Sequence, residues 1–204
     1  VLTVKAQENA AFYNEISNFK KQDSLKFPPK NAVLFIGSST FTKWKDAQVH
    51  FPEHVIVNRG FGGSTLLNVI HYIDDVVYPY QPKQVVIYCG ENDFMNTGTT
   101  PQMVADRTKK LIDLIRQKYP KTFIAYISIK PSPSRAKYIP QMKEVNALIK
   151  TLISQTKRAS YINTAEAMYH PDGTIMTDIF LKDNLHMNEK GYAIWRGIME
   201  PYLK

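Results

Sequence analysis

The chain has 204 residues, of which 26 are Lys or Arg and 18 are Asp or Glu, so its formal net charge is +8. This length suits one domain with a substantial buried core, and no uninterrupted apolar run approaches the roughly 20 residues that span a bilayer, which excludes an integral membrane protein. The positive charges are spread along the sequence without a zinc-finger or RNA-binding motif, so we expect no nucleic-acid partner.

Two features bear on the compartment in which the protein works. Cys89 is the only cysteine, which excludes an internal disulfide, and its place at the end of an apolar run predicts a buried thiol. The sequence begins at Val1, and its first residues fit the tail of a removed export signal, although no charged segment precedes them to test this. Export to the periplasm or medium and a cytoplasmic location both remain open.

The first 30 residues form a predicted helical lead-in. Apolar side chains, among them Ala10, recur at roughly helical spacing between residues 6 and 24, and Pro28-Pro29 ends the stretch. We expect this lead-in, residues 1–30, to pack on a single domain formed by residues 31–204.

Strand and helix patterns alternate through the rest of the chain. Five short apolar runs are typical of strands buried on both faces of a parallel sheet: residues 32–36, 55–57, 84–88, 123–127 and 160–162. Helical spacing predicts helices over residues 64–77, 101–118, 138–155 and 188–199. The alternation predicts an α/β fold with an open, five-stranded parallel sheet and helices on both faces. Residues 163–187 remain unassigned, and a loop this long is usually functional.

Small and polar residues follow the first three predicted strands, at the sheet edge where open α/β folds bind ligands. These groups, with a fourth near the C-terminus, are Gly37-Ser38-Ser39-Thr40, residues 58–64, Gly90-Glu91-Asn92-Asp93 and Asp183-Asn184-Leu185-His186. Taken alone, each has a plain structural interpretation as a helix cap, a turn or a surface contact. Together they place a hydroxyl, an imidazole, a carboxylate and amide donors at one edge of the sheet.

In this order the four groups resemble the four blocks of the SGNH hydrolases, the superfamily of GDSL esterases, lipases and acylhydrolases. The resemblance spans residues 37–186 and implies a flavodoxin-like, three-layer α/β/α sandwich with a five-stranded parallel sheet. It implies that Ser39 is the nucleophile, that His186 takes its proton, and that Asp183 orients the imidazole. A serine hydroxyl needs such an adjacent base, because it is a weak nucleophile by itself.

The resemblance also implies an oxyanion hole, and the sequence departs from the superfamily pattern at Ser38 and, more mildly, at Thr40, where an aliphatic residue is usual. The side-chain amide of Asn92 and the backbone N–H groups of Gly63 and Ser39 would donate to the charged oxygen of the intermediate. Ser38 stands where the superfamily has Asp. Because Ser38 and Ser39 are adjacent, Ser38 remains the second candidate for the nucleophile.

The same resemblance implies hydrolysis of carboxylic esters without a metal or other cofactor. We expect a small acyl group, above all acetyl, on a small molecule or a carbohydrate, which would make the protein an acetylesterase. A lysophospholipase or a platelet-activating-factor-acetylhydrolase-like lipid esterase is the alternative. Five aromatic residues near the motifs are candidates either for a substrate-binding wall or for the core: Trp44, Phe61, Phe94, Tyr169 and Phe180.

Two interpretations from other classes remain open at the level of sequence. The hydroxyl residues after the first strand, Ser38 to Thr42, resemble the phosphate loop of flavodoxin-like proteins, which would make the protein a flavin or phosphate binder. An inactive binding module on the same fold is the other. The first leaves Asp183, His186 and Asn92 without a role, and retention of Ser39, Asn92 and His186 argues against the second. The sequence says nothing of the oligomeric state.

Overall fold

The computed structural model describes residues 2–204, with side chains from residue 12 onward. Val1, where the stretch related to an export signal begins, and the side chain of Ala10 lie outside the described part. The strands are β1 (Val33–Gly37), β2 (Ile56–Gly60), β3 (Gln84–Tyr88), β4 (Phe123–Ile127) and β5 (Ala159–Ile162). The α-helices are α1 (Leu2–Leu25), α2 (Ser39–Lys43), α3 (Ala47–His50), α4 (Leu66–His71), α5 (Ile73–Val76), α6 (Pro101–Lys118), α7 (Ile139–Ser154) and α8 (Glu189–Met199).

The five strands form one sheet in the order β2-β1-β3-β4-β5, with every neighbouring pair parallel. This confirms the predicted five-stranded parallel sheet. β1 lies inside the sheet, and its last residue, Gly37, pairs with Gly60 on one side and Tyr88 on the other. The carboxyl ends of β2, β1 and β3 therefore meet at one edge, where the first three motif groups begin.

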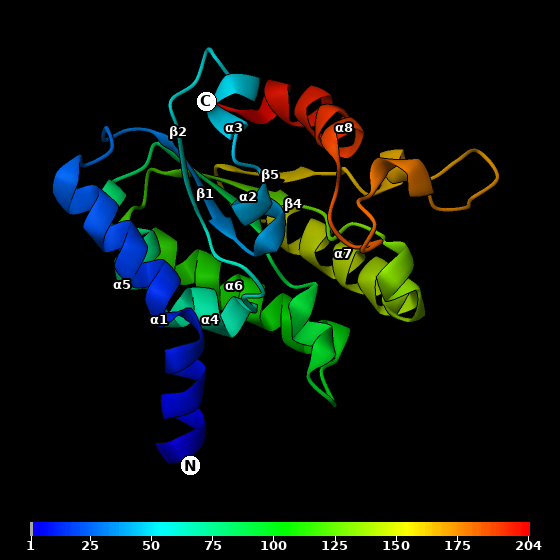
Figure 1. Ribbon diagram of the computed structural model, residues 1–204, viewed down its shortest axis with the longest axis horizontal. Coiled ribbons are helices and arrows are strands. Elements are labelled where there is room, and N and C mark those ends of the chain that lie inside the picture. The colour runs from blue at the N-terminus through cyan, green and yellow to red at the C-terminus, as the bar shows by residue number, and fades with distance from the viewer. Residues whose placement is uncertain (1) are drawn as a thin grey trace.

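Alternate residues of the strands enter two separate cores, because successive side chains of a strand point to opposite faces. Leu34 and Ile36 of β1 pack in the core that contains side chains of α1, α4, α5, α6 and α7. Val33 and Phe35 pack in the other core, with side chains of α2, α3 and α8. Figure 1 shows these two groups of helices on opposite sides of the sheet, which gives the expected three layers.

Two elements differ from the sequence prediction. β2 continues through Asn58, Arg59 and Gly60, which were expected in a loop, because pairing with β1 extends to Gly37. The helix expected over residues 64–77 is divided into α4 and α5 at Tyr72, whose φ of −95° and ψ of 18° lie outside the helical range. The spacing of apolar residues runs through this break and so does not reveal it.

A largely buried cluster of Asp23, Arg59 and Tyr80, here called the α1 anchor, fastens α1 to β2. Arg59 forms an ion pair with Asp23, and its Nε donates to the Tyr80 hydroxyl at 2.6 Å. The guanidinium also lies over the rings of Phe19 and Tyr80, at 5.1 and 4.8 Å from their centroids. The C-terminal half of α1 is thereby tied to the outer strand of the sheet, while the helix runs on to the N-terminus at the margin of the molecule (Figure 1).

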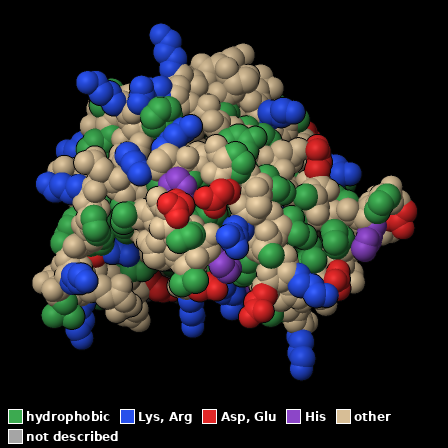
Figure 2. Space-filling view, turned by 90° about the horizontal axis from the view of Figure 1, so that it is seen from above, with side chains coloured by type: hydrophobic (Ala, Val, Ile, Leu, Met, Phe, Trp, Pro, Cys, Tyr) green, Lys and Arg blue, Asp and Glu red, His purple; other side chains and the backbone are tan. Residues whose placement is uncertain are grey.

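The positive charges of the chain are distributed over its surface. Figure 2 shows Lys and Arg side chains scattered around one face, without a single basic patch. Within residues 2–204, no helix combines the length and apolar character needed to cross a membrane.

Candidate active site

The turn after β1 delivers Ser39 to the edge of the sheet. Gly37 has a φ of 130°, and a Cβ placed on it would lie 1.9 Å from the carbonyl oxygen of Tyr88. Only glycine fits this position, because the conformation and the close approach both exclude a side chain. The N–H of Ser38 then donates to the same Tyr88 oxygen at 3.1 Å, and Ser39 begins α2.

Ser39, His186 and Asp183 form a continuous hydrogen-bonded series. Nε2 of His186 lies 3.0 Å from Oγ of Ser39, and Nδ1 lies 2.6 Å from Oδ2 of Asp183. With its proton on Nδ1, facing the carboxylate, the imidazole can accept the serine proton at Nε2. The structure thus brings together three of the predicted site residues. It places Ser39 against the imidazole, whereas Ser38 is 3% exposed.

The loop that carries the imidazole is held by its own aspartate. Oδ1 of Asp183 accepts from the backbone N–H groups of Leu185 and His186, both at 3.0 Å, and the N–H of Leu181 donates to the carbonyl of His186 at 2.8 Å. Burial opposes ionisation of Asp183, but the His186 imidazole and these two N–H groups outweigh it and hold the pKa of the carboxyl well below its usual range. Asp183 therefore stays negatively charged beside the imidazole.

Gly63 and Asn92 lie in neighbouring loops that are joined through Ser64. Nδ2 of Asn92 donates to the carbonyl of Ser64 at 3.1 Å, and the Ser64 hydroxyl donates to the carbonyl of Gly37 at 3.0 Å. A side-chain amide has two N–H bonds, so this contact orients the Asn92 group and leaves the second N–H for another acceptor. Gly63 has a φ of 79°, and its Cβ position faces open space.

Asp93 fixes the loop of Asn92, at a position where the sequence alone indicates only a turn. Its carboxylate is fully buried and accepts from the N–H of Leu66 at 2.9 Å and from Arg107 at 2.8 Å. Burial raises the pKa of this carboxyl. Asp93 thus connects the loop after β3 to the start of α4 and to α6.

A second set of buried polar side chains was missed in the sequence. Tyr88, Glu91 and Lys130, here called the bridging network, are 1%, 5% and 1% exposed. The Tyr88 hydroxyl donates to Oε2 of Glu91 at 2.7 Å, and Nζ of Lys130 lies 3.2 Å from the same oxygen. Nζ also donates to the carbonyl of Leu185 at 2.8 Å. The hint available in the sequence is that Lys130 follows the apolar strand β4 by three residues, where a buried charge is costly unless it has partners.

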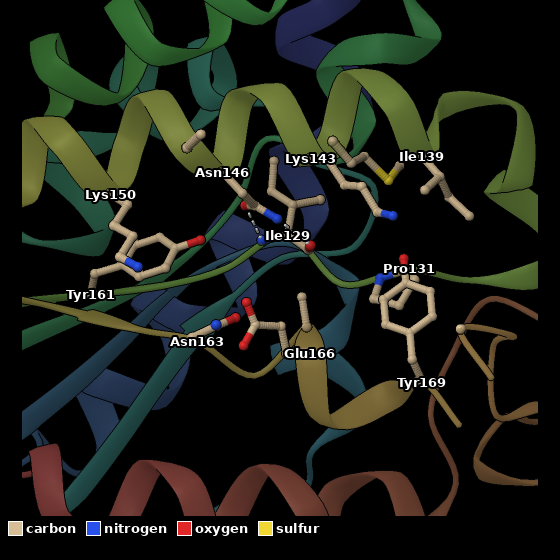
Figure 3. A pocket seen from close by; sticks show the side chains of 14 residues that line it. Ile129, Pro131, Ile139, Lys143, Asn146, Lys150, Tyr161, Asn163, Glu166 and Tyr169 are labelled. Carbon is tan, nitrogen blue, oxygen red and sulfur yellow. Dashed lines mark hydrogen bonds between the residues drawn. The ribbon is translucent and has the colours of Figure 1, made fainter. Parts of the chain in front are cut away.

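A groove of about 570 Å³ lies between α7 and the segment that follows β5. Figure 3 shows Lys143 and Asn146 of α7 on one side, and Tyr161, Glu166 and Tyr169 on the other. Ser39, Asp183 and His186 are not among its lining residues. Its wall includes Ile129 and Pro131, which flank Lys130 in the loop after β4.

The aromatic residues near the motifs have different positions. Trp44, Phe61, Phe94 and Phe180 are 1%, 0%, 5% and 7% exposed and belong to the two cores, so they do not form a substrate wall. Tyr169 alone is half-buried and lines the groove. Cys89 is buried as predicted, and burial raises the pKa of its thiol.

No group of three or more His, Cys, Asp or Glu side chains in the described part of the chain is arranged to hold a metal ion.

A sequence model of the GDSL-like Lipase/Acylhydrolase family matches residues 35–194. The chain belongs to this family. Membership confirms the resemblance seen in the four motif groups and makes the protein a hydrolase of ester bonds. It therefore favours the enzyme interpretation over a flavin or phosphate binder.

Solved structures share the fold of this GDSL-like protein. A protein from Streptococcus pneumonia, provisionally described as a platelet activating factor, is 19% identical, with a TM-score of 0.83 and coverage of 100% of this chain and 99% of that one. A GDSL-like lipase from Bacteroides thetaiotaomicron is 17% identical, with a TM-score of 0.76 and coverage of 92% and 96%. An acetyl-xylooligosaccharide esterase variant from Geobacillus is 15% identical, with a TM-score of 0.66 and coverage of 84% and 93%. At these identities the likeness establishes the fold alone, and no curated protein sequence matches the chain.

Proposed function

We propose that the protein is a serine esterase that removes small acyl groups, above all acetyl, from hydroxyl groups of a small molecule or a carbohydrate. The observation that carries this proposal is the hydrogen-bonded series in which 3.0 Å separates Ser39 Oγ from His186 Nε2 and 2.6 Å separates His186 Nδ1 from Asp183 Oδ2. These distances are within hydrogen-bond reach for proton transfer from a nucleophile to its base.

In the first half-reaction, His186 Nε2 accepts the proton of the Ser39 hydroxyl as Oγ attacks the ester carbonyl carbon. Asp183 stabilises the imidazolium that results. The negative oxygen of the tetrahedral intermediate accepts hydrogen bonds from the N–H groups of Ser39 and Gly63 and from the Asn92 amide. Loss of one such donor typically lowers turnover by about 10²–10³-fold. The intermediate collapses when the ester C–O bond breaks, and the alcohol leaves with the proton from His186.

In the second half-reaction, His186 deprotonates a water molecule that attacks the acyl carbon on Ser39. The same donors hold the negative oxygen of the second intermediate. The bond from Ser39 Oγ to the acyl carbon then breaks, Oγ recovers its proton from His186, and the carboxylic acid is released.

We place sugar units remote from the reacting ester in the groove beside α7, which Ser39 and His186 do not line. It presents the rings of Tyr161 and Tyr169 together with the polar groups of Asn163 and Glu166, a mixture suited to a ligand with apolar faces and many hydroxyl groups. Its volume of about 570 Å³ is within the usual range for small-molecule sites. The loop that forms part of its wall also carries Lys130, which contacts the His186 loop.

The nucleophile is tested with a fluorophosphonate probe and p-nitrophenyl acetate. We expect the probe to label wild-type protein at Ser39, and we expect Ser39→Ala to abolish both labelling and hydrolysis. Ser38→Ala, the adjacent control, keeps both. The assignment is wrong if Ser39→Ala keeps near wild-type activity while Ser38→Ala loses it.

The acyl group is tested by comparing p-nitrophenyl acetate with p-nitrophenyl octanoate. We expect the acetate to have the higher kcat/KM. Faster cleavage of the octanoate would contradict the small-acyl proposal and would favour the lysophospholipase or acetylhydrolase-like lipid esterase alternative.

A further inference from the structure

Lys130 is a buried cation that the proposed hydrolytic steps do not use. Its side chain is 1% exposed, and Nζ has three kinds of partner: the carboxylate of Glu91 at 3.2 Å, the carbonyl of Leu185 at 2.8 Å and the ring of Phe180 at 5.7 Å. An ammonium group has three N–H bonds and no acceptor, so these contacts satisfy it. Transfer of a charged group from water to the protein interior is costly even when the charge is paired. The burial of Lys130 therefore calls for an explanation in terms of what its contacts hold in place.

The partners of Lys130 belong to the two loops that carry the proposed base and an oxyanion donor. Glu91 directly precedes Asn92, and Leu185 directly precedes His186. Glu91 is itself held by the Tyr88 hydroxyl at 2.7 Å. Burial raises the pKa of Tyr88 well above its usual value, so this hydroxyl remains a donor.

The contact with Leu185 acts on the peptide group that carries His186. Lys130 binds the oxygen of this peptide at 2.8 Å, and Oδ1 of Asp183 binds its N–H at 3.0 Å. Because a peptide group is planar, two partners at opposite ends fix its orientation. The preceding carbonyl, that of Asn184, accepts from the N–H of Ser134 at 3.0 Å, so the loop after β4 holds the His186 loop at two successive positions.

We propose that Lys130 is a positioning residue that sets the imidazole of His186 for proton transfer from Ser39, by fixing the Leu185–His186 peptide and linking it to the Glu91–Asn92 loop. This inference rests on the proposed function. Lys130 touches no reacting atom, so its contribution is to the geometry of His186, where a displacement of about 1 Å can cost on the order of 10²-fold in rate.

The experiment compares two neutral double variants, Lys130→Met with Glu91→Gln and Lys130→Gln with Glu91→Gln. Neither leaves a buried charge without its partner, and the two differ chiefly in whether residue 130 carries an N–H donor. We measure Tm, the rate constant for labelling of Ser39 by a fluorophosphonate, and kcat and KM for p-nitrophenyl acetate. Labelling and kcat are expected to fall by about 10- to 100-fold in the Met variant with KM little changed, and to be partly restored in the Gln variant.

The matched control is Lys109→Met with Asp113→Asn, which neutralises a lysine–aspartate pair on α6 whose side chains are both 59% exposed. It should label at the wild-type rate. A folded Met variant that labels at the wild-type rate overturns the inference, and so does equal loss in the Met and Gln variants. These outcomes are distinct from failure of the proposed function, in which Ser39 of the wild-type protein would not be labelled at all.

Discussion

The α1 anchor and the bridging network contain the same kinds of side chain but join different parts of the molecule. Each joins a tyrosine hydroxyl, a carboxylate and a cation in a buried position. In the anchor, Arg59 of β2 binds Asp23 of α1 and the Tyr80 hydroxyl, and it donates to the backbone carbonyl of its own neighbour Asn58 at 2.9 Å. In the bridging network, Lys130 bonds a backbone carbonyl 55 residues away, beside His186.

The composition of a cluster therefore does not decide whether its charge serves stability or activity. A cation that holds a helix on a sheet contributes to the free energy of folding. A cation that orients the peptide of a proposed catalytic base contributes to the rate as well. Substitutions in the α1 anchor should therefore lower stability more than activity, and substitutions around the proposed base should lower activity more than stability.

The largest expected effect is on activity with little change in stability. Asp183→Asn should lower kcat by about 10⁴-fold, because a neutral amide neither favours the required imidazole tautomer nor stabilises the imidazolium. The asparagine Oδ1 can still accept from the N–H groups of Leu185 and His186, so the protein should stay folded, with a small drop in Tm from the loss of the carboxylate charge. The measurement is kcat on p-nitrophenyl acetate together with thermal unfolding. Asp178→Asn, which neutralises another aspartate of the segment between β5 and α8, is the control. A loss of kcat below tenfold in Asp183→Asn would contradict the assigned role.

The next effect is on stability with little change in activity. Arg59→Met should lower the free energy of unfolding by about 1–3 kcal/mol, because it leaves Asp23, whose side chain is 12% exposed, with the Tyr80 hydroxyl but without its cation. Chemical denaturation measures this change, and kcat of the folded protein should stay near wild type. Adding Asp23→Asn should recover part of the stability. A loss of kcat in folded Arg59→Met would erase the distinction between the two clusters.

The pH dependence of activity should show one ionisation on its acid side. Asp183 has a lowered pKa in the folded protein, so its contribution to stability is fully present above the unfolded value of about 3.9 and is lost only as pH falls below it, through the folded value. Asp183 therefore stays charged over the pH range in which a histidine general base is protonated and inactive. The logarithm of kcat/KM should fall with a slope of one, and a slope of two, or flat activity to about pH 4, would argue against this arrangement.

The smallest expected effect is on substrate binding, at Tyr169 in the groove beside α7. Tyr169→Ala should raise KM for an acetylated oligosaccharide by roughly fivefold, which corresponds to about 1 kcal/mol of aromatic contact, and should leave KM for p-nitrophenyl acetate unchanged. Tyr13→Ala, at an exposed position on α1, is the control. An equal change for both substrates would place Tyr169 in the general support of the site and not in binding of the sugar.

The sequence predicts local patterns well and misses partners that are distant in the chain. Short apolar runs give the five strands, and four ordered motifs lead to the family and to the residues that the fold gathers. From the sequence, Arg59 is expected in a loop, because the polar pair Asn58-Arg59 follows Val57 and marks the apparent end of a strand. Its burial depends on Asp23, 36 residues earlier. Lys130 is likewise a single lysine in the sequence, and only the sheet brings Glu91 and Leu185 to it.

Ser39 and His186 are 147 residues apart in the chain, so the ribosome adds them at different times. At about 5–20 residues per second, the ribosome adds His186 roughly 7 to 30 s after Ser39. α8 follows later still, and its Tyr192 hydroxyl donates to the carbonyl of Thr40 in α2 at 2.8 Å. A nascent chain stalled anywhere in this interval carries the serine without a base, so it cannot attack the esters of the cell before the fold is complete.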